Sequence, residues 1–188
     1  NIQDSLEVSD GDTINAKKIL NIIKNASSNH SIVCNYLYII GHLDFKEAGI
    51  DTVKCKLIFN MCTFIDGIFI KNTVFNSYIS FNKSKINYIV RINSNTVFKD
   101  HLSFSNVTFN KSVNIDSTTF NGPAMFVNSD FIDYVSINQT TFNKFSSFRQ
   151  STFNNGFNLQ ETRFHDLTDF QYSEFLKNTI FIQPTFFD

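Results

Sequence analysis

The stretch TTFNGPAMFVNSDF, residues 118–131, places three phenylalanines at intervals of six and then five residues. The whole chain has 188 residues, with 23 phenylalanines and no tryptophan. The alternation of six and five continues along most of the chain, so that apolar residues, here called anchors, recur at every eleventh position in two series. A fixed interval kept over so many copies indicates a repeat architecture.

Anchors of the two series alternate along the chain. Their spacing is regular except for one extra residue in INSNTVF, residues 92–98. The first series consists of Phe64, Phe75, Ile86, Phe98, Phe109, Phe120, Phe131, Phe142, Phe153, Phe164, Phe175 and Phe186. The second series consists of Phe59, Ile70, Phe81, Ile92, Phe104, Ile115, Phe126, Ile137, Phe148, Leu159, Phe170 and Phe181. We expect these residues to form the core.

An eleven-residue period is also typical of the right-handed coiled coil. In a helix, however, a step of six residues rotates the side chain by roughly 240°, so the two series would lie on separate faces. The repeats are rich in Asn, Ser, Thr, Phe and Ile, which favours strands. Because a five-residue step reverses the face of a strand and a six-residue step keeps it, the chain must turn a corner between anchors. The sequence therefore predicts a solenoid of short strands.

The number of sides follows from the second series, in which Phe and aliphatic anchors alternate, so that each kind recurs at every second anchor of the series. If equivalent positions stack, each coil has four sides, with three inner columns of mainly Phe and one of aliphatic residues. Residues two positions before an anchor should also point inward, and they are mostly small in the first series. With coils about 4.8 Å apart, the six or so coils from residue 59 form a rod on the order of 28 Å long.

Units such as STTF, NSDF, QTTF, QSTF and ETRF resemble the Phe-centred variety of the pentapeptide-repeat family. The resemblance covers residues about 57–187 and implies an all-β fold, a right-handed quadrilateral parallel β-helix. The strict five-residue spacing of the family is replaced here by alternating five and six, which we interpret as a wider corner after each first-series anchor. Asn121, Gly122 and Pro123 occupy one such corner, where proline fits because it has no N–H to donate to a ladder.

The N-terminal region predicts a short capping α-helix at 13–27, with Thr13 or Asn15 as its N-cap. We expect a polar segment at 1–12, an irregular first coil and loop at 28–56, with 46–56 as the loop, and the β-helix at 57–188. The apolar face of the helix consists of Ala16, Ile19, Leu20 and Ile23.

The C-terminal end shows no second capping helix, although a solenoid exposes core and ladder groups at an open end. Phe186 and Phe187 are expected beside that open face. Two interpretations stay open with equal weight: an end-to-end homodimer through these residues, or a chain that has been shortened.

The charge of the chain is nearly balanced, with 16 basic and 17 acidic residues and a formal net charge of −1. This balance argues against nucleic acid as a partner. Residues 71–111 nevertheless hold six basic residues and one acidic one. We call this set the basic belt and expect a solvated face: Lys71, Lys83, Lys85, Arg91, Lys99 and Lys111.

The chain offers no catalytic, cofactor-binding or metal-binding constellation. Cys34, Cys55 and Cys62 lack CxxC spacing, which favours buried free thiols over a zinc site or a disulfide framework. The four histidines are scattered in the sequence and the glycines are isolated. No apolar run approaches the roughly 20 residues of a membrane span, and no signal peptide is visible.

The compartment stays undetermined. Because the sequence begins with Asn, we leave an extracellular location open in case an upstream signal was removed, and favour the cytoplasm slightly.

The leading hypothesis is a non-enzymatic β-helical scaffold that presents its sides or ends to a protein partner of unknown identity. The resemblance implies an alternative, a DNA mimic that binds a type II topoisomerase such as DNA gyrase. Duplex DNA carries about one charge per 1.7 Å, so a rod of this length would have to imitate on the order of 16 negative charges. A third hypothesis is an extracellular structural or adhesive module. The Asn-x-Ser/Thr glycosylation triplets that begin at Asn82, Asn106 and Asn138 would accept glycans only in a secreted protein.

Overall fold

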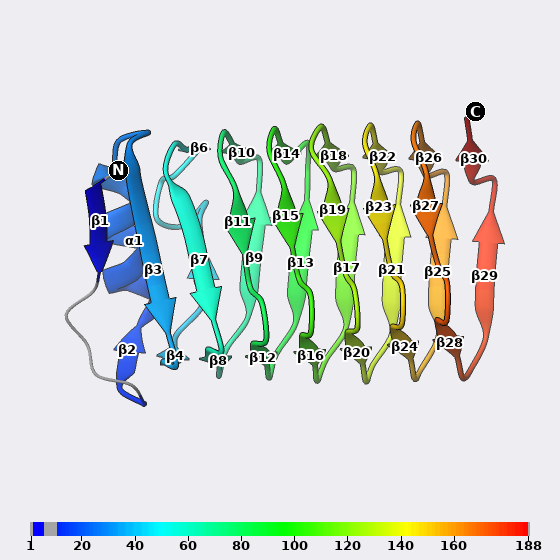
Figure 1. Cartoon of the computed structure of the whole chain (residues 1–188), viewed down its shortest axis with the longest axis horizontal. Coiled ribbons are helices and arrows are strands. Elements are labelled where there is room, and N and C mark those ends of the chain that lie inside the picture. Colours follow the sequence, from blue (N-terminus) through cyan, green and yellow to red (C-terminus); the bar gives the residue numbers. More distant parts are fainter. Residues whose placement is uncertain (1, 6–10, 188) are drawn as a thin grey trace.

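The computed structural model describes residues 2–5 and 11–187, which form a straight rod of stacked coils (Figure 1). Four parallel sheets run along the rod, two with eight described strands and two with seven, so the solenoid makes about eight turns. From residue 30 onward the chain visits the four sheets in a constant order, and we call the corresponding sides A, B, C and D. The quadrilateral parallel β-helix predicted from the anchor spacing is thus confirmed.

Sides A and B carry mostly two-residue strands after the first coils. Side A consists of β1 (Ile2–Ser5), β3 (His30–Asn35), β7 (Lys56–Asn60), β11 (Ile79–Ser80), β15 (Leu102–Ser103), β19 (Ala124–Met125), β23 (Ser146–Ser147) and β27 (Thr168–Asp169). Side B consists of β2 (Thr13–Asn15), β4 (Tyr38–Ile40), β8 (Thr63–Phe64), β12 (Lys85–Ile86), β16 (Thr108–Phe109), β20 (Asp130–Phe131), β24 (Thr152–Phe153) and β28 (Glu174–Phe175).

Side C has four-residue strands from its second strand onward and is the widest regular face. Its strands are β5 (Leu43–Asp44), β9 (Ile68–Lys71), β13 (Val90–Asn93), β17 (Val113–Asp116), β21 (Val135–Asn138), β25 (Phe157–Gln160) and β29 (Thr179–Ile182). Side D consists of β6 (Thr52–Val53), β10 (Val74–Phe75), β14 (Val97–Phe98), β18 (Thr119–Phe120), β22 (Thr141–Phe142), β26 (Arg163–Phe164) and β30 (Thr185–Phe186).

The register of the sheets places each anchor beside the anchor one coil away. On side D, Phe120 pairs with Phe98 and Phe142. On side C, Ile115 pairs with Ile137, which gives the aliphatic column. The extra residue in 92–98 is absorbed at one corner, where Ser94 and Asn95 both have positive φ.

Stacked phenylalanine rings line the interior of sides A, B and D. The ring centroids of Phe120 and Phe142 are 4.7 Å apart with an interplanar angle of 9°, and those of Phe126 and Phe148 are 4.9 Å apart at 2°. Burying one such side chain stabilises the fold by about 1.5–3 kcal/mol. The phenylalanine ladder is therefore the main apolar core of the rod.

The inward residues two positions before the first-series anchors bind the corners of successive coils together. The Ser129 hydroxyl donates to the carbonyl of Phe104 at 2.6 Å, and the Ser173 hydroxyl donates to that of Phe148 at 2.6 Å. In turn, the Ser129 N–H donates to the Ser151 hydroxyl at 3.1 Å. Small hydroxyl residues are needed here because they satisfy buried backbone groups without displacing the rings.

The five-residue steps contain tight corners that the sequence did not predict. Each passes through a residue in the left-handed region, such as Ser117 with φ 48° and Asn128 with φ 52°. An L-residue in this region costs roughly 1–2 kcal/mol. Side-chain ladders accompany these corners, as where the Asn128 amide donates to the Asn106 side-chain oxygen at 2.7 Å.

The six-residue steps make the wider corners, and their hydrogen bonds explain Pro123. The Pro123 carbonyl accepts from the Leu102 N–H at 3.0 Å. At the equivalent corner position in other coils, the N–H of His101 donates to Asp100 and that of Leu167 donates to Asp166, both at 2.7 Å. Since the inter-coil ladder does not use this N–H, proline removes nothing from it.

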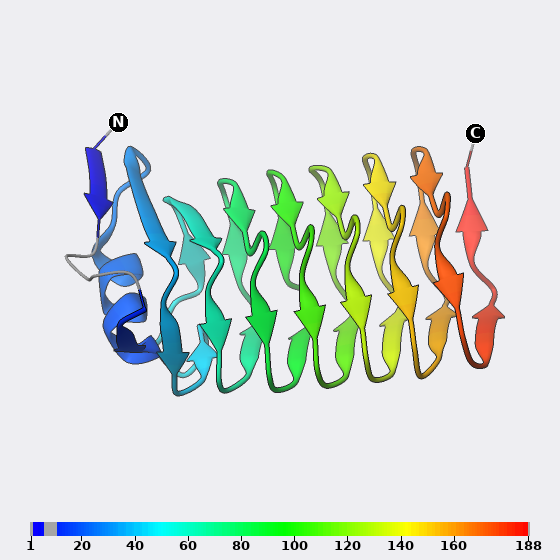
Figure 2. The same ribbon diagram turned by 60° about the horizontal axis from the view of Figure 1, so that its bottom comes forward.

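One helix occurs in the described residues, α1 (Ala16–Asn25), and it covers the N-terminal end of the rod (Figure 2). Asn15 is its N-cap, because the Asn15 side-chain oxygen accepts from the Lys17 N–H at 2.9 Å. Thr13, the other candidate cap, lies in β2. The expected apolar face is buried: Ala16, Ile19, Leu20 and Ile23.

Residues 28–56 differ from the irregular coil and loop expected there, because they provide one strand to each side, β3 to β6. Thr52–Val53, inside the expected loop 46–56, forms β6 and pairs with β10. The eleven-residue spacing did not predict these strands, because this coil is longer than the next one. Leu43 pairs with Ile68 and Val53 pairs with Phe75, so the path from side C to side D is longer in this coil than in the one that follows. The insertion between these two sides hides the coil from an eleven-residue count.

The expected polar segment 1–12 also contains structure. Its residues Ile2–Ser5 form β1, which pairs in parallel with β3 and extends side A by one strand. Residues 1 and 6–10 lie outside the described part of the chain.

Candidate interaction surfaces

The histidines lie apart from one another in the fold. Nδ1 of His42 accepts from the Gly67 N–H at 3.0 Å, and Nδ1 of His30 accepts from the Ser27 N–H at 2.8 Å. His101 packs against Tyr78, and burial lowers its pKa despite the opposing effect of Asp100. His165 stacks on Phe187 with 4.3 Å between ring centroids. Within residues 2–5 and 11–187, no group of His, Cys, Asp or Glu is arranged to hold a metal ion.

The three cysteines are buried thiols that form no disulfide among the described residues, as expected from their spacing. Burial raises the pKa of Cys62 to about 11, and it raises the pKa of Cys34 further, with the neighbouring Cys62 thiol adding to the effect. The Cys62 thiol donates to the carbonyl of Cys34 at 3.3 Å. These are the properties of packing residues rather than of nucleophiles, because the reactive form of cysteine is the thiolate.

We expect all three thiols of the native protein to resist a disulfide reagent such as Ellman's reagent at pH 8, and to react fully once urea unfolds the chain. Because the pKa of Cys62 in the fold lies above its ordinary value, its contribution to stability is present below about pH 9 and declines as the pH rises toward 11. Urea titrations at pH 8 and pH 10 measure that decline. Rapid labelling of a native thiol at pH 8 would contradict the packing role.

The basic belt does not form one surface. Lys71 and Arg91 lie on side C, Lys85 lies on side B, and Lys99 directly follows β14 on side D. Lys111 lies near Asp133, whose pKa is held below its usual value mainly by the Asn155 amide, next by the Tyr134 N–H, and least by this lysine. A continuous basic track for nucleic acid is therefore lacking among the described residues.

The core anchors lie inside the rod from Phe59 to Phe164, where every anchor is buried. The last four anchors differ. Phe170 and Phe175 are partly buried, whereas Phe181 is 54% exposed and Phe186 is 58% exposed. This gradient follows from position, because the ring of an anchor is covered on both faces only where a coil lies on either side of it.

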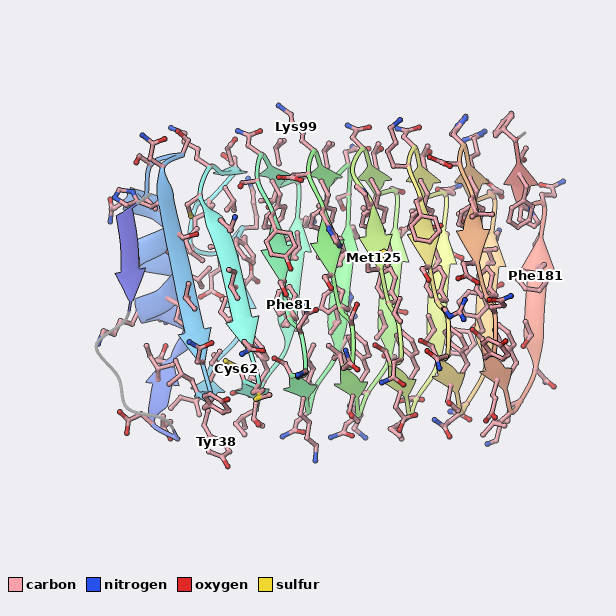
Figure 3. All side chains as sticks on the ribbon, in the orientation of Figure 1. Tyr38, Cys62, Phe81, Lys99, Met125 and Phe181 are labelled. Atoms are coloured by element: carbon pink, nitrogen blue, oxygen red, sulfur yellow. The ribbon has the colours of Figure 1, made fainter. Side chains whose placement is uncertain are left out.

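The C-terminal end of this chain is open, in contrast to the end covered by α1 (Figures 1 and 2). The final strands β27, β28, β29 and β30 each have a hydrogen-bonded neighbour on one side only, within residues 2–5 and 11–187. Phe181 lies at this end in Figure 3. The large apolar residues exposed in the last coil, here called the terminal patch, are Leu167, Tyr172, Leu176, Ile180, Phe181, Ile182, Phe186 and Phe187.

The residues that point outward on side C change from polar to apolar in the last coil. In β25 they are Asn158 and Gln160, whereas in β29 the residues paired with them are Ile180 and Ile182. These isoleucines are 45% and 43% exposed. The anchor spacing gave no sign of this change, although a comparison of outward residues coil by coil would have revealed it.

The glycosylation triplets share their residues with the corners of the coils. In the triplet at Asn82 the third residue, Ser84, is 3% exposed, and in the triplet at Asn138 the third residue, Thr140, is fully buried. The Thr140 hydroxyl donates to the carbonyl of Asn138 at 2.9 Å. These triplets are therefore explained by packing of the repeat.

No helix in the described residues is both long and apolar enough to cross a membrane.

Comparison with protein families identifies the repeat. Residues 104–152 match the family described as pentapeptide repeats (9 copies). Neither the curated proteins nor the solved structures gave a match to this chain. The matched segment lies in the middle of the rod, and the coils on both sides of it keep the same four-sided register. Residues 104–152 are therefore similar to pentapeptide repeats, and the stacked coils of the chain form a quadrilateral β-helix.

Proposed function

We propose that this protein is a non-enzymatic β-helical scaffold that self-associates through the terminal patch. The rod supplies a rigid support, because its core is continuous from the helix α1 to the last coil. A rigid surface loses little conformational entropy on binding, which favours association. The partner at the terminal patch is a second copy of this chain.

The observation that carries the proposal is the replacement of Asn158 and Gln160 by Ile180 and Ile182 on the outside of side C. These positions point away from the core, so neither the packing of this coil nor that of any further coil would bury them. Large apolar patches on the surface of soluble proteins commonly mark interaction sites.

The size of the terminal patch suits a dimer. Its eight side chains are all more than two-fifths exposed. Since a large side chain has roughly 150–250 Å² of surface, the patch exposes on the order of 800 Å² in total, which is what each partner contributes to an interface of standard size.

We expect the 188-residue chain to be a dimer at micromolar concentration by sedimentation velocity. Replacing the outward pair with the residues of the preceding coil, Ile180→Asn with Ile182→Gln, should weaken the dimer by about tenfold or more, because burying two isoleucines is worth several kcal/mol. The strands should be retained, since Asn and Gln occupy these positions in β25. Circular dichroism verifies that the variant is folded.

The matched control is Ile132→Asn. Ile132 is 43% exposed, much like Ile182, but it lies in the middle of the rod, and Asn154 occupies the equivalent position one coil later. Dimerisation of this control should equal that of the parent. A monomeric parent chain, or equal weakening by both sets of substitutions, would refute the terminal patch as the interface.

The DNA-mimic alternative receives no support from the distribution of charge. Asp130 and Glu174 lie on side B, Asp169 lies on side A, and Glu161 and Asp166 lie at two different corners. A mimic of duplex DNA requires a dense and regular negative surface. We therefore expect no inhibition of gyrase supercoiling at stoichiometric amounts of this protein.

A further inference from the structure

Side B carries a second apolar surface, close to the end covered by α1. In each coil, three residues two positions apart lie on or beside this side, with the first residue of the strand in the middle. In the coils of β4 and β8, five of these six are large apolar or aromatic residues that are 36% to 48% exposed. We call them the N-terminal patch: Tyr36, Tyr38, Ile40, Met61 and Ile65. In the next four coils of the described chain, only Ile132 is an exposed large apolar residue at an equivalent position.

The middle residues of side B form one row along the rod, and charge is unevenly distributed in it. The strands that carry the row follow the lower edge of the rod in Figure 1, and Tyr38 lies at this edge in Figure 3. The row consists of Tyr38, Thr63, Lys85, Thr108, Asp130, Thr152 and Glu174. Lys85 is exposed and forms no ion pair within residues 2–5 and 11–187. One carboxylate oxygen of Asp130 accepts from the Asn154 amide at 2.6 Å, which holds the carboxylate in place. The row is therefore basic on one side of Thr108 and acidic on the other.

A row with this distribution of charge complements itself when two copies pack antiparallel. Lys85 and Asp130 each lie one coil from Thr108, in opposite directions. A two-fold axis through Thr108 therefore places Lys85 of each copy opposite Asp130 of the other. Parallel packing would instead place Lys85 opposite Lys85 and Asp130 opposite Asp130, and opposed like charges disfavour an interface.

The same axis brings apolar residues together at both ends of the contact. Tyr36 and Ile40 lie three coils from Thr108, and Tyr172 and Leu176 lie three coils from it in the other direction. Tyr172 is 71% exposed and Leu176 is 58% exposed. The axis places this pair of each copy opposite Tyr36 and Ile40 of the other. An axis one coil away would oppose these apolar residues to polar ones and would lose the contact of Lys85 with Asp130.

We propose that side B is a second self-association surface, on which another copy of this chain packs antiparallel about a two-fold axis at Thr108. The inference goes beyond the terminal patch, because Ile180 and Ile182 point outward from side C. Tyr172 and Leu176 belong to both surfaces. Since the two contacts face different directions, together they join dimers into larger assemblies at high concentration.

The size of side B predicts that this contact is the weaker of the two. Three rows two residues apart, over the seven coils from β4 to β28, make a face about 13 Å by about 29 Å. Such a face buries on the order of 500 Å² on each copy, less than the roughly 800 Å² of a standard interface. Met61 and Ile65 also lie opposite polar residues, Gln150 and Asn154. We therefore expect association through side B only well above the concentration at which the terminal patch dimerises.

Sedimentation equilibrium of the variant with Ile180→Asn and Ile182→Gln tests side B separately from the terminal patch. We expect a monomer–dimer equilibrium with a dissociation constant on the order of 100 µM. Lys85→Asp and Asp130→Lys should each weaken this dimer by about tenfold or more, because the contact occurs twice across the axis. The two substitutions together should restore it to within about threefold. Each places a residue that the row already holds two coils away. Lys99→Asp makes the same change on side D and should leave the dimer unchanged.

Cross-linking with a bismaleimide in the same variant tests the orientation. Thr108→Cys lies on the axis and should cross-link between copies, whereas Thr152→Cys faces Thr63 of the other copy and should not. Parallel packing would cross-link at both positions, and the native cysteines are buried. Absence of a dimer at about millimolar concentration, or a charge exchange that does not restore it, would refute side B and leave the terminal patch standing. A parent dimer that Lys85→Asp weakens and the two isoleucine substitutions do not would support side B and refute the terminal patch.

Discussion

Replacing Phe142 with aspartate is expected to unfold the central coils of the rod. Phe142 is fully buried in β22, and its ring stacks on those of Phe120 and Phe164 with centroids 4.7 Å and 4.9 Å away. The substitution removes the ring, leaves a cavity and puts a carboxylate into an apolar column. Loss of the ring alone costs about 3–5 kcal/mol, and an unpaired buried carboxylate costs more. We expect at least about 5 kcal/mol in total, which is enough to unfold many domains.

Two controls separate the charge from its position. Phe142→Leu keeps an apolar residue and imitates the aliphatic column, so it should cost only about 1–2 kcal/mol. Thr141→Asp places the same carboxylate one residue earlier, on the half-exposed outer face of β22, where substitutions usually change stability by about 0.5 kcal/mol or less. Urea titration followed by circular dichroism measures all three. A Phe142→Asp variant as stable as its parent would disprove that the column holds the coils together.

The prediction of the fold succeeded because stacking enforces a repeated environment. Each anchor touches its counterpart one coil away, as Phe98 touches Phe120, so a residue that suits one coil suits the next. The sequence consequently repeats with the period of the coil, and the alternation of Phe with Ile or Leu reveals four sides.

The parts that escaped prediction are those where a coil departs from its neighbours. The tight corners hold residues as different as Ser117, Gln139 and Tyr172 in the left-handed region, so residue type gave no warning. The first complete coil was not predicted, because the insertion between its sides C and D changes the number of residues in the coil.

Gly122 is the second position where we expect a large effect, and here the cause is steric. A Cβ added to Gly122 would lie 2.4 Å from the carbonyl carbon of Asp100 and 2.8 Å from the nitrogen of His101. Both contacts are with backbone, so no side chain can move aside. The equivalent position one coil later is Lys144, which shows that this corner of the rod does accept side chains elsewhere. One difference between the two corners is that Pro123 follows Gly122 whereas Phe145 follows Lys144, and a proline ring fixes its own φ and restricts the residue before it.

This dependence on proline makes the prediction specific. Gly122→Val should destabilise the protein by about 3 kcal/mol, the upper range for overpacking, because the corner cannot relax while Pro123 is present. Pro123→Ala alone should cost less than about 1 kcal/mol, since the inter-coil ladder does not use the N–H at this position. The double variant should be more stable than Gly122→Val by about 1 kcal/mol or more, because without proline the corner can adopt the conformation found at Lys144. Urea titrations of the four proteins measure this coupling. Strictly additive effects would mean that the close approach to Asp100 is set by the stacked coils themselves rather than by the proline.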